Sequence, residues 1–94
     1  MLDLELAMQV TINCIRDETG LGENDPIEAE DNLLRLGIDD TRMDQFKNRI
    51  ANDGTHGLPS LNPPFLIDVG LLDFDETATV ADASSKVARN AVLA

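Results

Sequence analysis

The stretch Leu36-Gly37-Ile38-Asp39-Asp40 is the most informative part of this 94-residue chain. A glycine stands between apolar residues, and glycine adopts the backbone angles that tight bends require. The two aspartates come directly afterwards, where carboxylates cap free backbone N–H groups and lie at the positive end of a helix dipole. The stretch therefore predicts a bend followed by the start of a helix.

The residues after this bend have the period of an amphipathic helix. Met43, Phe46 and Ile50 stand at i, i+3 and i+7, so they form one apolar face. Gly54 follows soon after the last of them, and glycine commonly ends a helix. We expect a helix over about residues 40–52.

The N-terminal segment predicts a longer helix over about residues 3–19. Asp3 is its expected N-cap, and Gly20 and Gly22 are expected to end it. Its buried stripe is expected to combine large apolar side chains with two small ones: Leu4, Met8, Ile12 and Ile15, with Ala7 and Thr11.

Residues 17–31 carry seven acidic side chains and no basic one, which is typical of a solvated loop. Asn24-Asp25-Pro26 is a turn signal in its middle. The apolar group that follows is too short to predict a helix, but its large side chains are expected to pack beneath neighbouring elements and anchor the loop: Leu33, Leu34, Leu36 and Ile38.

The segment after the second helix, residues 53–64, contains glycines, prolines and His56, and predicts an irregular connection. Asn62 is expected to cap a short third helix that begins at Pro63, since proline suits a first helical turn. Gly70 leaves a bent or extended segment as the alternative. The expected buried face of this helix is Phe65, Leu66, Val69 and Leu72.

The last predicted helix covers about residues 80–92. Thr79-Val80-Ala81-Asp82 has the form of a capping box, with Asp in place of the usual Glu. Four apolar residues follow at helical spacing, namely Val80, Ala83, Val87 and Ala91.

Composition limits the partners and the compartment. Eighteen acidic and seven basic residues give a net charge of −11, which repels nucleic acid and anionic membranes and favours basic protein surfaces or cations. Cys14 is the only cysteine, so no internal disulfide forms, and its apolar neighbours predict a buried structural thiol. We expect a cytoplasmic protein, since neither a signal peptide nor a membrane-spanning stretch is recognisable.

These features together resemble the acyl and peptidyl carrier proteins. That family consists of small acidic four-helix bundles whose second helix begins at Leu-Gly-x-Asp-Ser-Leu and whose last helix commonly opens with Thr-Val. The corresponding stretches here are Leu36-Gly37-Ile38-Asp39-Asp40-Thr41 and Thr79-Val80-Ala81-Asp82. The resemblance implies a single all-α domain over residues 1–94, an acyl-carrier-protein-like four-helix bundle with a short third helix.

Asp40 stands where the family carries phosphopantetheine on a serine oxygen. A carboxylate cannot replace the hydroxyl nucleophile that forms this phosphodiester, so we expect Asp40 to be unmodified and no cofactor to be attached. Thr41 is a less favoured attachment site, because one residue along a helix turns the side chain by about 100°. Ser60, close to Pro63 and Pro64, is expected to be a loop serine.

The resemblance also implies that partners contact the second helix, where the candidate contact residues are Arg42, Met43 and Phe46. This segment is nearly neutral, because its basic residues offset Asp39, Asp40 and Asp44. The acidic loop over residues 17–31, which includes Glu28, Glu30 and Asp31, is therefore the better candidate surface for a basic partner.

Metal binding and catalysis are not expected. Asp17 to Glu28 has the length of an EF-hand loop with Gly22 at its sixth place, but Leu21 occupies a ligand place. His56 is the only imidazole, and no nucleophile is placed to use it.

The sequence thus predicts a non-catalytic protein-interaction module with a carrier-type fold and a degenerate phosphopantetheine site. Its expected partners are synthases or transferases of lipid biosynthesis, in fatty-acid or polyketide-type pathways. The alternative is a genuine acyl carrier protein that is modified elsewhere, or a variant that lacks its serine.

Overall fold

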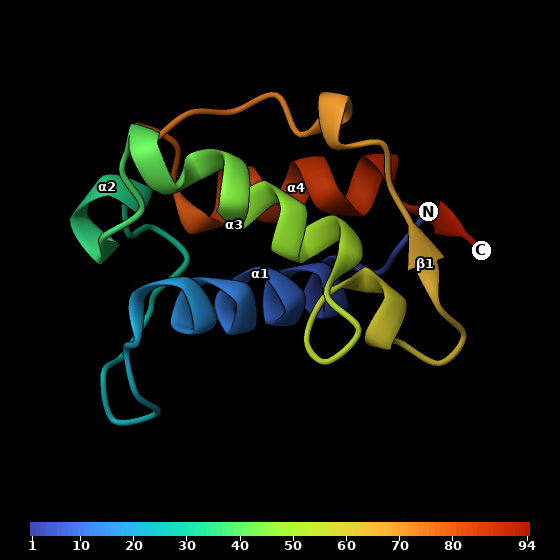
Figure 1. Cartoon of the computed structure of the whole chain (residues 1–94), viewed down its shortest axis with the longest axis horizontal. Helices are drawn as coiled ribbons and strands as arrows, with labels where there is room; N and C mark the ends of the chain where they lie inside the picture. The colour runs from blue at the N-terminus through green and yellow to red at the C-terminus, as the bar shows by residue number, and fades with distance from the viewer.

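Three long helices form the body of the molecule in the computed structural model, which describes residues 1–94. These are α1 (Leu4–Thr19), α3 (Asp40–Asn52) and α4 (Val80–Asn90), and both α3 and α4 pack against α1 (Figure 1). A one-turn helix, α2 (Leu33–Leu36), precedes α3. The chain is mostly helical, as predicted, and none of its helices has the length and apolar character needed to cross a membrane.

The predicted ends of α1 are confirmed. The carboxylate of Asp3 accepts a hydrogen bond from the Glu5 N–H at 2.7 Å, and Gly20 ends the helix in the left-handed region with φ 79°. The predicted buried stripe is only partly right, because 51% of Leu4 is exposed. Ala7, Thr11 and Ile15 are buried as predicted, and the face that α3 and α4 cover also contains Val10, Cys14 and Glu18.

The predicted bounds of α3 are confirmed, and its apolar stripe of Met43, Phe46 and Ile50 is buried. The capping box of α4 is present: the Thr79 hydroxyl accepts from the Asp82 N–H at 3.1 Å, and the Asp82 carboxylate accepts from the Thr79 N–H at 3.2 Å. Helix α4 ends at Asn90, two residues before the predicted end.

The predicted helix beginning at Pro63 is wrong, and the alternative of a bent or extended segment is confirmed. Residues Phe65–Leu66 form strand β1, which pairs antiparallel with strand β2 (Val92–Leu93). Two short 3-10 helices, η1 (Leu58–Ser60) and η2 (Val69–Leu71), flank β1 along the chain. The C-terminal backbone provides hydrogen-bond partners that a local pattern cannot reveal, and it holds this segment extended. Leu72 is the only fully buried residue of the predicted apolar face.

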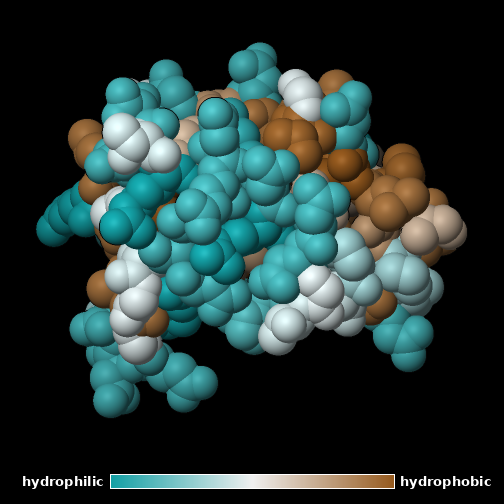
Figure 2. Space-filling view, in the orientation of Figure 1, coloured by the Kyte–Doolittle hydropathy of each residue, from teal (hydrophilic) through white to brown (hydrophobic).

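Apolar side chains fill the core and are also exposed at one end of the molecule. Seventeen buried apolar residues form one cluster between the helices. The first turns of α3 and α4 lie at the same end as α2, whereas both chain termini and β1 lie at the other end (Figure 1). Apolar surface gathers near β1 and the termini (Figure 2), where more than half of Met1, Leu66, Val92 and Leu93 is exposed.

Candidate functional site

The predicted bend before α3 is present and is held by backbone hydrogen bonds. Gly37 has φ 106°, and its N–H donates to the Leu34 carbonyl at 3.0 Å. The Ile38 N–H donates to the Leu33 carbonyl at 2.9 Å, and both of these side chains are fully buried. Leu33 and Ile38 thus anchor the bend. Their burial agrees with the expected packing of the apolar group, whereas 52% of Leu34 is exposed and Leu33–Leu36 form a helix that the sequence did not predict.

Asp39 is the N-cap of α3, as predicted. Its Oδ1 atom accepts from the Thr41 hydroxyl at 2.7 Å and from the Arg42 N–H at 3.1 Å. These hydrogen bonds, above all the one from Thr41, hold the pKa of Asp39 below its ordinary value. The Thr41 hydroxyl is therefore engaged in the cap.

The pKa of Asp39 makes the contribution of this cap pH-dependent. Because the folded-state pKa is lowered, the ionised cap stabilises the fold above the unfolded-state pKa, and this stabilisation is lost as pH falls through the folded-state pKa. Asp39→Asn keeps a capping oxygen but does not titrate. We therefore expect wild type to lose more stability than Asp39→Asn between about pH 5 and about pH 2.

Urea unfolding at successive pH values measures this difference. Asp44→Asn is the matched control, because the Asp44 side chain is exposed and makes no hydrogen bond, and it should follow wild type. If the free energy of unfolding fell equally with pH in wild type and Asp39→Asn, the stabilisation by the cap would not depend on the charge of Asp39.

Asp40 is the first residue of α3, and its carboxylate points into solvent without a hydrogen-bond partner. The bend therefore presents an exposed carboxylate at the start of α3. Ser60, the other hydroxyl considered from sequence, lies in η1 beyond the far end of α3 (Figure 1), where its Oγ donates to the Gly57 carbonyl at 2.6 Å. The structure does not bring Ser60 to the bend.

The basic residues of α3 are directed largely at α1, which the sequence did not reveal. Glu18 of α1 has only 5% of its side chain exposed; its Oε1 accepts from Arg49 Nε at 2.8 Å, and its Oε2 lies 3.6 Å from Arg42 Nη1. The hydrogen bond to Glu18 raises the pKa of Arg49. The Arg42 guanidinium also donates to the Glu18 carbonyl at 2.7 Å. Two cations of α3 thus offset Glu18 rather than Asp40 and Asp44.

Two of the predicted partner-contact residues are corrected by their burial. Met43 and Phe46 have 7% and 0% of their surface exposed, because their apolar stripe faces the other helices. They therefore belong to the core and cannot form a contact surface in the folded protein. Arg42, half of whose side chain is exposed, remains available on this helix.

The acidic segment with Glu28, Glu30 and Asp31 lies against the N-terminus of α4. The Asp31 carbonyl accepts from the Val80 N–H at 2.9 Å, and the Asp31 carboxylate accepts from the Glu28 N–H at 2.8 Å. Glu28 and Glu30 are exposed. Since α3 and α4 begin at the same end of the molecule (Figure 1), these carboxylates share that end with Asp39 and Asp40.

The structure also assembles a group that the sequence reasoning missed. One donor atom each from Asp17, Asp53 and His56 lie within 4.8 Å of one another, and His56 Nδ1 is 2.6 Å from Asp17 Oδ2. The spacing of Asp53 and His56 was a weak local signal, but Asp17 joins them only through the packing of α1 on α3. The EF-hand-like pattern from Asp17 to Glu28 brings no three Asp, Glu, His or Cys side chains together.

Cys14 is buried, as predicted, and burial raises the pKa of its thiol to about 12. Its sulfur lies 3.9 Å from the His56 carbonyl oxygen. The thiol therefore stays protonated at neutral pH and acts as a packing group.

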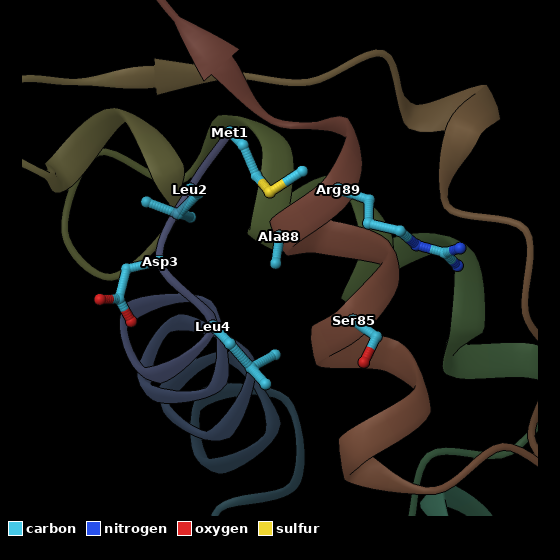
Figure 3. A pocket seen from close by; sticks show the side chains of 7 residues that line it. All are labelled: Met1, Leu2, Asp3, Leu4, Ser85, Ala88 and Arg89. Carbon is cyan, nitrogen blue, oxygen red and sulfur yellow. The ribbon is translucent and has the colours of Figure 1, made fainter.

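The cavities of the molecule lie away from the bend. The largest, about 610 Å³, opens between the start of α1 and the last turns of α4. Figure 3 shows Leu4 and Ser85 on opposite sides of this opening, with Met1 near its upper edge. The others, of about 450 and 350 Å³, are lined by residues of the 73–86 region and of the second half of α3. None is lined by residues 36–41.

Comparisons with protein-family models, curated proteins and solved structures found no match for this chain.

Proposed function

We propose that this protein is a carrier-type interaction module that binds another protein without a phosphopantetheine arm. The single observation that carries this proposal is the exposed Asp40 carboxylate, at the first position of α3 directly after the Leu36-Gly37-Ile38-Asp39 bend. The geometry around residue 40 suits the display of a group to a partner. The chemistry of residue 40 does not suit attachment of the arm.

The nearby chemistry supports an arm-free function. Formation of the phosphodiester needs a hydroxyl nucleophile, and a carboxylate would give only a labile acyl phosphate. The Thr41 hydroxyl donates to Asp39, and the Ser60 hydroxyl donates to Gly57 at a distant place. Neither hydroxyl is both free and positioned at the start of α3.

The partner we propose has a basic surface and contacts the acidic end of the molecule. This end combines Asp40 with Glu28 and Glu30, all exposed. Complementary charge of this kind favours rapid encounter and selects against acidic partners. By its resemblance to carrier proteins, the chain acts in the cytoplasm beside synthases or transferases of fatty-acid or polyketide type, and has no catalytic role of its own.

Incubation with coenzyme A and a promiscuous phosphopantetheinyl transferase tests this proposal. We expect intact-protein mass spectrometry to show no mass increase for the wild-type chain, while a functional carrier protein in the same reaction is fully modified. Stoichiometric addition of the arm to wild type would overturn the proposal in favour of a genuine carrier. Thr41→Val and Ser60→Ala would then identify the modified hydroxyl.

Asp40→Ser is the matched variant, since it restores the hydroxyl at the same exposed position. We expect the arm to be attached to the serine introduced at position 40 and to no other residue, because the bend before α3 is retained. Failure of a folded Asp40→Ser variant to accept the arm would contradict the carrier-type geometry that we assign to this end of the molecule.

A further inference from the structure

Asp17, Asp53 and His56 reach one place from three separate segments. Asp17 lies in the last turns of α1, Asp53 is the C-cap of α3, and His56 lies in the loop that leads to η1. Their donor atoms fall within 4.8 Å of one another. This group takes no part in the function proposed above, and it lies at the opposite end of α3 from Asp40.

The loop that carries Asp53 and His56 is closed by its own backbone. The Asp53 N–H donates to the Arg49 carbonyl at 3.0 Å, and the Asp53 carbonyl accepts from the Gly57 N–H at 2.9 Å. Asp53 Oδ1 accepts from the Thr55 N–H at 3.0 Å. A Cβ atom on Gly57 would lie 2.3 Å from the Arg49 carbonyl oxygen, so glycine permits this close approach. His56 thus lies between Asp53 and Gly57, whose backbone positions are set by these contacts.

The charges of the group favour a cation. Two carboxylates face one imidazole, and the nearby guanidinium of Arg49 already donates to Glu18 at 2.8 Å. About 44% of the His56 side chain and 27% of the Asp17 side chain are exposed, so an ion can enter from solvent. An imidazole nitrogen beside carboxylate oxygens suits zinc and similar transition metals, whereas calcium and magnesium prefer oxygen ligands alone.

We propose that Asp17, Asp53 and His56 bind a divalent transition-metal ion of the Zn²⁺ class. The two aspartates supply carboxylate oxygens, His56 supplies a ring nitrogen, and water completes the coordination. The bound ion connects the end of α1 to the loop after α3. It therefore stabilises the folded chain, by an amount that grows with the logarithm of the free-ion concentration once this exceeds the dissociation constant.

Titration of the purified chain with Zn²⁺, observed by NMR and by calorimetry, tests this site. His56 is the only histidine, so its ring signals report on the site without ambiguity. We expect saturable binding of one ion with a change in the His56 ring resonances. Ca²⁺ at the same concentrations should leave these resonances in place.

Matched variants separate this site from the general attraction of an acidic protein for cations. His56→Ala should abolish the saturable phase, and Asp17→Asn and Asp53→Asn should each weaken binding by roughly tenfold or more. Glu23→Gln, which removes an exposed carboxylate elsewhere, should bind as wild type does. Circular dichroism verifies that each variant is folded.

Three results would overturn the site. The first is His56 resonances that do not move with Zn²⁺, and the second is unchanged zinc affinity in folded His56→Ala. The third is unchanged affinity in both aspartate variants, which would leave His56 as a single surface ligand. None of these results bears on the coenzyme A experiment, so the two proposals succeed or fail separately.

Discussion

Phe46→Ala is expected to lower the free energy of unfolding by about 3–5 kcal/mol. Phe46 is the largest of the fully buried side chains, and it comes from the middle of α3. Its ring meets the Phe74 ring edge-on, with 6.3 Å between the centroids. Truncation removes apolar contact and leaves a cavity that the surrounding helices can only partly close.

Urea unfolding followed by far-UV circular dichroism measures this loss. A domain of this size has roughly 5–15 kcal/mol of stability, so the variant should be marginally folded. Phe46→Leu is the matched control, because it keeps most of the volume and should cost less than about 1.5 kcal/mol. An effect of Phe46→Ala no larger than that of Phe46→Leu would contradict the assignment of Phe46 to the core rather than to a partner surface.

Arg49→Met is expected to cost about 2 kcal/mol, less than the loss of a fully buried ion-pair partner because the arginine is partly exposed. Only 5% of the Glu18 side chain is exposed, and Arg49 Nε lies 2.8 Å from its Oε1. Methionine keeps much of the apolar stem but not the charge. The variant therefore leaves a buried carboxylate with Arg42 as its remaining cation.

Arg42→Met is the control for this prediction, because half of the Arg42 side chain is exposed and its distance to Glu18 Oε2 is 3.6 Å. We expect a smaller loss for Arg42→Met than for Arg49→Met in chemical denaturation. Equal losses in the two variants would contradict the dominant role of Arg49.

Some features of the candidate site follow from neighbouring residues, whereas others depend on contacts between distant parts of the chain. The bend at Gly37, the cap at Asp39 and the start of α3 at Asp40 follow from neighbouring residues, so the sequence located them correctly. The role of Met43 and Phe46 depends on which side of α3 faces the other helices. Their apolar periodicity predicted burial, and the resemblance to carrier proteins wrongly made them contact residues as well.

The ion-pair and hydrogen-bond partners of the charged side chains could not be predicted from the sequence, because they also come from distant parts of the chain. Glu18 looked like part of a solvated acidic run, but it is buried because α3 brings two arginines to it. Asp17 and His56 are 39 residues apart along the chain, and only the packing of the helices makes them neighbours. Charge counted along a segment cannot describe such pairs, since Coulombic interaction depends on distance in space.

By itself, the sequence determined the elements whose ends are set locally: α1 from Asp3 to Gly20, α3 after its aspartate cap, and the start of α4 at its capping box. Helix caps and helical periodicity act over a few residues, so they can be read without the fold. The tertiary structure alone decided that residues 65–66 are extended, because their hydrogen-bond partners lie at the C-terminus. It alone also placed Glu18 between two arginines and gathered Asp17, Asp53 and His56, since these contacts exist only after the helices have packed.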